Sequence, residues 1–252
     1  MRVTATFSAV VMLALAAWAQ NAAAPAGDIC RIYFVKPKPG MDQQLEAGRK
    51  KHMQFHKSHK DAWTWSTYLI ETGMNTGTYV TSTCGHQWAD FDDWEKKLGE
   101  ADTADANTNM GPSQGSAWNG FYRYRADIST NTPGPPLPLS AVTIYKLHVG
   151  KSDDFVGAVR KITDALQKAN WPYKGAWLQL VNGGEAPTFV LVSERKGWAE
   201  FALPSKTVQQ AVEEAFGKDQ ADAIWKTVDA SIAQVFTEAA SYRPDLSYIP
   251  GK

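Results

Sequence analysis

One short pattern occurs twice in this sequence, and the two copies lie 110 positions apart. In each copy an apolar, β-branched run precedes a tryptophan, a small residue, an acidic residue and a phenylalanine. The first copy is Thr78-Tyr79-Val80 with Trp88-Ala89-Asp90-Phe91, and the second is Thr188-Phe189-Val190 with Trp198-Ala199-Glu200-Phe201. The run predicts a strand, and the tryptophan predicts a helix start, where an acidic residue is favourable. The chain is therefore predicted to contain two similar units.

Further matches occur in the same order along the chain. The two units end alike, at Tyr124-Arg125-Ala126-Asp127-Ile128-Ser129 and at Tyr242-Arg243-Pro244-Asp245-Leu246-Ser247. The other pairs are Gly40 with Gly150, Ala62-Trp63 with Ala176-Trp177, and Ile32-Tyr33 with Ile144-Tyr145. The offset between partners changes only where loops are expected, so the sequence predicts a tandem duplication.

Each unit is predicted to have the element order β-α-β-β-α-β. The first has expected strands at 28–35, 63–70, 78–84 and 118–125, helices at 41–59 and 88–98, and an irregular polar segment at 100–116. The second has expected strands at 142–149, 175–181, 188–194 and 237–243, and helices at 153–169, 206–216 and 219–235. The units span 28–129 and 141–250, and a stiff, proline-rich linker at 130–140 joins them.

The first 19 residues have the features of an export signal. Arg2 supplies positive charge, and the apolar stretch from Phe7 to Ala17 is too short to span a bilayer. Ala17-Trp18-Ala19 has the small-x-small form of a cleavage site, and Ala22-Ala23-Ala24 is a second such site. We predict a signal peptide at 1–19 and an exported mature protein, periplasmic or secreted, without a membrane span. The alternative is an anchor that stays uncut.

Charge composition excludes one class of partner. Lysine plus arginine equals aspartate plus glutamate, at 26 each. Because no basic excess is available to neutralise phosphates, nucleic acid is not an expected partner.

The two cysteines, Cys30 and Cys84, suit an oxidising compartment, where an even count indicates a disulfide. Cys30 opens the first predicted strand and Cys84 closes the third, so the two meet if these strands are antiparallel neighbours. A bond between them would close a loop of 54 positions, which the chain-entropy model associates with about 4 kcal/mol of stabilisation. The alternative is a pair of buried free thiols.

Three histidines are spaced to share one stripe of the helix predicted at 41–59. At about 100° per residue, His56 lies about 40° from His52, and His59 lies about 20° to its other side. Lysines occupy the remaining sides, so the stripe is predicted to face inward. At the offset of 110 the second unit has Ile162, Leu166 and Ala169 at these positions. Imidazoles thus replace aliphatic side chains. Each buried polar group that is left unpaired costs about 1–3 kcal/mol of folding free energy.

Several partners could compensate this cost, and the sequence leaves them open. The histidines can be satisfied by hydrogen bonds or solvent, can line a polar ligand pocket or transfer protons, or can bind a metal or haem. His52 and His56, at i and i+4, could bind zinc or copper if His59 or His86 completed the site. No His-Glu-x-x-His pattern occurs, and His59 can simply cap backbone carbonyls. We expect no assigned metal, with His52, His56 and His86 as weak candidates.

The aromatic residues of the second strand admit two interpretations. Trp63, Trp65 and Tyr68, with Trp177 of the second unit, could line an apolar cavity. They are also the large side chains that a core needs, and this interpretation is favoured. Likewise the Tyr-Arg-x-Asp endings could hold an anion, but an Arg-Asp pair that holds the strand end is favoured because both units have it.

In layout, each unit resembles a ferredoxin-like unit of the dimeric α/β-barrel superfamily. The resemblance covers nearly the whole mature chain and rests on element order and paired anchors, not on a catalytic motif. It implies an α+β protein with two ferredoxin-like repeats that pair their antiparallel sheets into an intramolecular α/β barrel, as an internal pseudo-dimer within a monomer. It also implies that the first and third strands are neighbours, which supports a Cys30–Cys84 bond. Members include small monooxygenases and haem-using enzymes, which hold haem on the helix side of the sheet.

These observations support three functional hypotheses. The first is an exported protein without an assigned reaction that binds a small, partly apolar ligand beside the His52/His56 helix, with His59, Trp63 and Trp65 as further contacts. The second is an oxidoreductase, either a cofactor-independent monooxygenase or a haem- or metal-dependent enzyme, that uses His52 or His56. The third is a structural or interaction module with a solid barrel. The expected cofactor is none, with haem or a divalent metal as the alternatives.

Overall fold

The computed structural model describes residues 27–130, here called the first half, and residues 135–251, the second half. The first half contains β1 (Ile29–Pro37), α1 (Asp42–Ser58), β2 (Ser66–Ile70), β3 (Tyr79–His86), α2 (Trp88–Trp94), the π-helical turn η1 (Glu95–Gly99), α3 (Glu100–Asn109) and β4 (Gln114–Tyr124). The second contains β5 (Leu139–Leu147), α4 (Ser152–Lys168), β6 (Ala176–Asn182), β7 (Thr188–Arg195), η2 (Trp198–Phe201), α5 (Val208–Phe216), α6 (Lys218–Ser231), β8 (Ile232–Tyr242) and η3 (Pro244–Leu246). The predicted signal peptide and residues 131–134 of the predicted linker lie outside the described residues.

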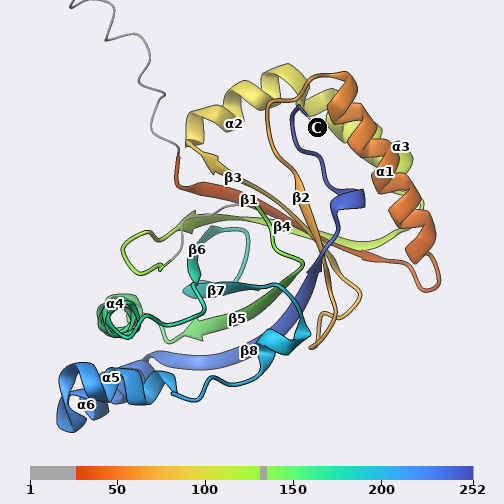
Figure 1. The fold of residues 1–252 in the computed structure, drawn as a ribbon. Coiled ribbons are helices and arrows are strands. Elements are labelled where there is room, and N and C mark those ends of the chain that lie inside the picture. The colour runs from red at the N-terminus through yellow and green to blue at the C-terminus, as the bar shows by residue number, and fades with distance from the viewer. Residues whose placement is uncertain (1–26, 131–134, 252) are drawn as a thin grey trace, which may run out of the picture.

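The strands form one antiparallel sheet whose order closes on itself, β1-β3-β2-β8-β5-β7-β6-β4 and back to β1. Each half contributes its strands in an equivalent order, β4-β1-β3-β2 and β8-β5-β7-β6. The halves join where β2 pairs with β8 and where β4 pairs with β6. Figure 1 shows α1, α2 and α3 on one side of the sheet and α4, α5 and α6 on the opposite side. The predicted α+β class is confirmed.

The offset of 110 between the halves holds through most of the elements. The bounds of β1 and β5 differ by this number, and so do those of α1 and α4. Thr67 pairs with Thr81 across β2 and β3, while Trp177 pairs with Leu191 across β6 and β7. The counterpart of Trp177 is therefore Thr67, and the predicted match of Trp63 with Trp177 is wrong. Trp63 lies in the loop before β2. In this loop the similar sequence letters of the two halves do not mark equivalent positions in the structure.

Three predicted boundaries also differ from the structure. The segment expected to be irregular, 100–116, contains all of α3 and the start of β4. Three alanines with high helix propensity favour α3, namely Ala101, Ala104 and Ala106. β2 begins at Ser66, later than expected. β8 begins at Ile232, earlier than expected, because Ile232 and Val235 pair with β5 and β-branched residues favour strands.

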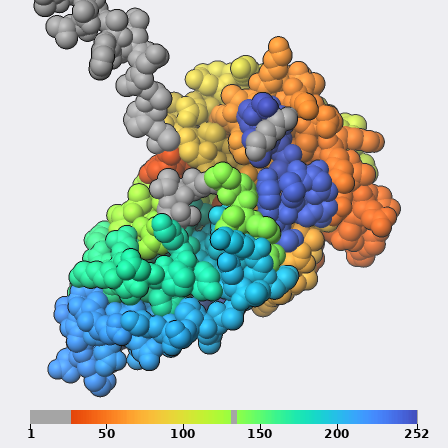
Figure 2. All heavy atoms as spheres, viewed as in Figure 1, coloured from red at the N-terminus to blue at the C-terminus, as the bar shows by residue number. Residues whose placement is uncertain are grey.

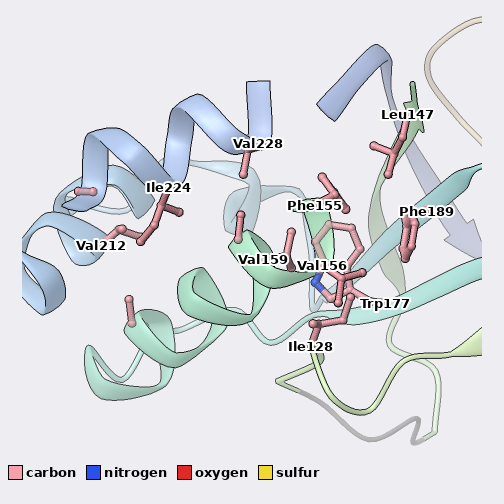
Figure 3. Packing of buried hydrophobic residues seen from close by; sticks show 13 residues of the cluster. Ile128, Leu147, Phe155, Val156, Val159, Trp177, Phe189, Val212, Ile224 and Val228 are labelled. Atoms are coloured by element: carbon pink, nitrogen blue, oxygen red, sulfur yellow. The ribbon is translucent and has the colours of Figure 1, made fainter. Parts of the chain in front are cut away.

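The second half packs α4 against its sheet through hydrocarbon side chains. Figure 3 shows Phe155 of α4 close to Trp177 and Phe189 of the sheet. The ring centre of Phe155 lies 5.4 Å from that of Phe189 and 5.8 Å from that of Trp177. Each such side chain stabilises the fold by about 1.5–3 kcal/mol when it leaves water. The helix–sheet layer of the second half is thus an ordinary apolar core.

The segment after the last strand of each half enters the core of the other half. Ile128, after β4, is fully buried in the cluster around Phe155. Leu246, after β8, is fully buried beside Leu45 and Tyr79 of the first half. Figure 2 shows the end of the chain, in dark blue, against residues of the first half, in orange. Each half is therefore completed by residues of the other.

An arginine–aspartate pair shapes both end segments. Arg125 donates Nε and Nη2 to the two carboxylate oxygens of Asp127, at 2.8 Å each. Arg243 does the same to Asp245, at 2.9 Å each. The bidentate geometry suits a planar guanidinium, and it confirms the predicted structural role of these pairs.

A disulfide joins Cys30 and Cys84, which confirms the predicted bond. It links β1 to β3, which pair with each other in the sheet. Among the described residues, every helix is too short or too polar to cross a membrane.

Removing a side chain of one half that is buried in the core of the other half is expected to destabilise the whole chain. Leu246→Ala and Ile128→Ala should each lower the free energy of unfolding by about 2–5 kcal/mol, because both side chains are fully buried. Urea denaturation measures this change. Leu203→Ala is the control, since Leu203 is 93% exposed, and it should change stability by less than about 0.5 kcal/mol. A Leu246→Ala variant as stable as the control would contradict the exchange of segments.

The Arg243–Asp245 pair is expected to give acid-sensitive stability. Hydrogen bonds from Arg243, opposed by partial burial, lower the pKa of Asp245 to about 2. A lowered carboxyl pKa stabilises the fold above the unfolded pKa of about 4, and this contribution is lost as pH falls towards about 2. Because the pair is half in solvent, the contribution at neutral pH is about 1 kcal/mol at most.

Asp245→Asn should therefore be less stable than the wild type at neutral pH, and the difference should vanish between pH about 4 and about 2. Chemical denaturation at several pH values measures it, with Asp92→Asn at an exposed position of α2 as the control. A difference that is independent of pH would show that the charge of Asp245 contributes nothing.

Candidate functional site

The layer between α1 and the sheet is polar in the first half, whereas its counterpart is apolar. Arg49, His52 and His56 of α1 occupy the positions of Val159, Ile162 and Leu166 of α4. His52 is 4% exposed and His56 is 1% exposed. Two of the three predicted inward histidines are thus buried where the second half has aliphatic side chains.

Two structural details bring α3 against these histidines. Gly48 allows close approach, because a Cβ there would lie 2.1 Å from the carbonyl oxygen of Asn109. The helical run from α2 to α3 also contains the π-helical turn η1. Such a turn inserts an extra residue and rotates the next turns of the helix, and it is frequent at functional sites. Asp102 and Asp105, one turn apart on α3, face α1 as a result.

Both histidines bind carboxylates through Nδ1. Nδ1 of His52 lies 2.8 Å from Oδ1 of Asp105, and Nδ1 of His56 lies 2.9 Å from Oδ2 of Asp61. A carboxylate only accepts, so each Nδ1 carries the hydrogen. The Nε2 atoms of both rings then point their lone pairs elsewhere, and each lies 3.4 Å from Oδ1 of Asp102.

Asp61 is held more firmly than any other carboxylate of the site. Oδ2 also accepts the indole N–H of Trp65 at 2.8 Å, and Oδ1 accepts the backbone N–H of Trp63 at 3.0 Å. The hydroxyl of Tyr248 donates to the backbone carbonyl of Asp61 at 2.8 Å. Burial acts to raise the pKa of Asp61, but the hydrogen bonds from His56, Trp65 and Trp63 outweigh it and lower the pKa. Asp61 is therefore an ionised, immobile anchor for His56.

Asp102 is the carboxylate of the group that is least well satisfied by hydrogen bonds. Its Oδ1 is buried and has no hydrogen-bond partner among the described residues, and burial raises its pKa to about 6. Burial, together with the positive charge of Arg49, lowers the pKa of His52 to about 4. At neutral pH a neutral imidazole thus faces a carboxylate that is largely withdrawn from solvent. This arrangement can accept a proton or a cation.

Arg49 connects the site to the end of the chain. Nε of Arg49 donates to the carbonyl of Leu246, and Nη2 donates to Oγ1 of Thr67, both at 3.3 Å. Burial lowers the pKa of Arg49 to about 10, although the charge of Asp102 opposes the shift. Arg49 is therefore still charged at neutral pH, and one of the two residues that accept its hydrogen bonds, Leu246, belongs to the second half.

The other predicted site residues lie outside this group. His59 is exposed, and its Nδ1 lies 2.9 Å from the carbonyl of Phe55, as expected of a helix cap. The prediction that His59 faces inward is wrong, because the helix ends at Ser58. His86 is buried, but Nε2 contacts Oγ1 of Thr83 at 2.6 Å, and its ring lies 3.9 Å from that of Trp63.

Trp63 and Trp65 pack in the aromatic cluster beside the site. Trp65 is buried, and the rings of Trp63 and Trp94 stack at 5.3 Å. Sequence reasoning missed three acidic residues, Asp61, Asp102 and Asp105. The i, i+3 spacing of Asp102 and Asp105 was the available signal, but it requires a helix where an irregular segment was expected.

The residues present do not fit a haem. The ring of His56 lies 5.1 Å from that of Trp65, 5.8 Å from that of Tyr248 and 4.7 Å from that of His52. Side chains thus fill the layer in which haem-using members of the superfamily hold their cofactor. In the part of the chain that is described, His52 and His56 direct every ring nitrogen at a carboxylate and none at a haem-sized space.

The comparisons with known proteins give similarity at the level of the fold. No protein-family model matches this sequence, and no curated protein matches it either. A provisionally assigned monooxygenase from Lactobacillus acidophilus has a TM-score of 0.55 and 7% identity over 89% of this chain and 97% of its own. An anthrone oxidase-like protein has a TM-score of 0.54 and 11% identity, with 90% and 94% covered.

A provisionally assigned chlorite dismutase has a TM-score of 0.54 and 10% identity, with 86% and 96% covered. At such identities the similarity concerns the fold and not the activity. The chain therefore shares the fold of proteins of the dimeric α/β-barrel type, along almost their whole length.

Proposed function

We propose that the protein is an oxidoreductase whose reaction centre is the polar layer of the first half. One observation supports this proposal most directly. Nε2 of His52 and Nε2 of His56 both lie 3.4 Å from Oδ1 of Asp102, a buried atom without a hydrogen-bond partner among the described residues. A core without a reaction would gain from the aliphatic residues that the second half has at the same positions. The fold similarity to monooxygenase-type proteins supports the same class of reaction.

In this proposal the first half binds a small, partly apolar substrate at the α3 side of the centre. The side chains of Asp102 and Asp105 are 18% and 25% exposed, whereas those of the histidines are 5% or less. In this proposal the substrate reaches the centre past these two partly exposed carboxylates. The cluster of Trp63, Trp65 and Trp94 supplies an adjacent aromatic wall.

The chemistry of the centre is the removal of a proton from the substrate. A neutral imidazole with a fixed tautomer is a general base, and Asp61 and Asp105 fix the tautomers of His56 and His52. Asp102, with a pKa of about 6, can take the proton onward because its pKa is close to the working pH. Oxidation of an anthrone by dioxygen to the anthraquinone and one water begins with such a deprotonation.

The proposal also covers the origin of the two halves and the cellular location of the protein. The two halves descend from one duplicated unit, and the closed sheet is the single-chain form of a barrel that other members build from two chains. The equal bounds of β1 and β5, and of α1 and α4, at an offset of 110 support this origin. The disulfide supports an exported protein, since such bonds persist in oxidising compartments.

The test replaces both histidines by asparagine. Asparagine keeps a donor near the place of Nδ1 and removes Nε2, so the bonds to Asp61 and Asp105 can persist. The double variant His52→Asn/His56→Asn should lose at least about 100-fold of the rate of oxygen consumption with an anthrone, as expected when a general base is removed. His59→Asn, at an exposed position, is the control and should keep the full rate.

Circular dichroism and thermal unfolding confirm that the double variant is folded. A folded double variant that oxidises the anthrone as fast as the wild type would exclude the histidines from the reaction. The protein would then be a binding or structural module whose polar layer is satisfied internally.

A further inference from the structure

We propose that His52, His56 and Asp102 bind one divalent transition-metal ion through Nε2, Nε2 and Oδ1. The inference rests on the proposed function only in taking the same centre as the active one. It replaces the general-base role of the two Nε2 atoms, because a nitrogen that binds an ion has no lone pair left to accept a proton. The three ligand atoms lie within 4.8 Å of one another, and they come from α1 and α3, which pack against each other.

The separations of the ligand atoms suit an ion. Both Nε2 atoms lie 3.4 Å from Oδ1 of Asp102, which is longer than an ordinary hydrogen bond between a nitrogen and an oxygen. Two ligands that are each about 2.1 Å from a tetrahedral ion are about 3.4 Å apart. Two nitrogens and one oxygen, each with a lone pair, therefore lie around a gap whose two measured N–O separations match those of ligands on a shared cation.

The surroundings of the histidines match those of metal ligands. A histidine that binds a metal through one nitrogen almost always donates the other N–H to a carboxylate or carbonyl, which fixes its orientation. Asp105 accepts from His52 in this way, and Asp61 accepts from His56. Asp61 is in turn held by Trp63 and Trp65. Both ligands thus have the supporting shell that a metal site needs.

The net charge around the histidines also favours a bound cation. Three carboxylates, Asp61, Asp102 and Asp105, surround the histidines, and Arg49 is the positive charge closest to them in the described interactions. Three negative charges and one positive charge leave a formal balance of −2 in a layer with little water. A divalent ion compensates this balance, which burial otherwise makes unfavourable.

The donor set defines the class of ion. Two imidazoles and one carboxylate suit Zn²⁺, Fe²⁺ and their neighbours rather than Mg²⁺ or Ca²⁺, which prefer oxygen ligands. Three protein ligands leave at least one position for water or substrate, as in catalytic sites. The same set with open positions occurs in non-haem iron oxygenases, so Fe²⁺ is the ion that agrees with an oxidoreductase.

The experiment uses the full mature chain after treatment with a chelator. Titration with Co²⁺, followed by its visible absorption, and with Zn²⁺, followed by calorimetry, should give one ion per chain. His52→Asn, His56→Asn and Asp102→Asn should each abolish this stoichiometric binding. Asp61→Asn should weaken it by about 10–100-fold, as found for supporting residues.

His59→Asn and His86→Asn are the controls, since neither histidine belongs to the group, and both should bind Co²⁺ like the wild type. A wild-type chain that binds no stoichiometric Co²⁺ or Zn²⁺ would overturn the inference, as would a folded Asp102→Asn variant with unchanged affinity. Zn²⁺ should also raise the midpoint of thermal unfolding of the wild type but not of the His52→Asn/His56→Asn variant, which checks the result without the cobalt spectrum.

The outcomes separate this inference from the proposed function. If no ion binds, but the histidine variants still abolish anthrone oxidation, only the metal inference fails. If one ion binds and the oxidation is unaffected by the variants, the metal site stands and the proposed oxidation fails.

Discussion

Every polar atom between α1 and the sheet of the first half needs a partner, because the layer excludes most water. An unpaired group there costs about 1–3 kcal/mol. The chain meets this requirement by pairing each histidine with its own carboxylate, His52 with Asp105 and His56 with Asp61. Asp102 Oδ1 is one of the buried atoms that keep no hydrogen-bond partner within the described residues, and it is the one that lies beside both histidines. The proposed function of the molecule depends on that unpaired oxygen.

The exchange of end segments makes this layer a property of the whole chain. Leu246 fills an apolar position of the first half, and its carbonyl also accepts from Arg49. Tyr248 donates to the backbone of Asp61. Both residues come after β8 and so belong to the second half. The second half therefore stabilises the centre through its own end, while its helix–sheet layer remains an apolar core without histidines.

Much of this arrangement was predictable because repeated anchors specify repeated elements. The paired endings after Tyr124 and Tyr242, and the paired glycines Gly40 and Gly150, identified the two halves and their order of elements. The disulfide could be inferred from strand adjacency. The partner of each histidine could not be predicted. Asp61 is near His56 in sequence, but its role depends on Trp65 and Trp63, which reach it only when the loop before β2 folds over α1.

Asp102 was hidden for a different physical reason. Its segment is rich in asparagine, threonine and aspartate, which compete with helix formation, so the three alanines alone do not identify the helix that packs on α1. The π-helical turn then alters the phase of the helix, so the face that a regular period would assign to Asp102 is not the one observed. Such a turn costs regular hydrogen bonds, and an apolar layer like that of the second half has no need of it. Among the described residues, a π-helical turn occurs only in the half whose helix–sheet layer contains carboxylates and histidines. This argues that the helix was shaped to bring a carboxylate to the histidines.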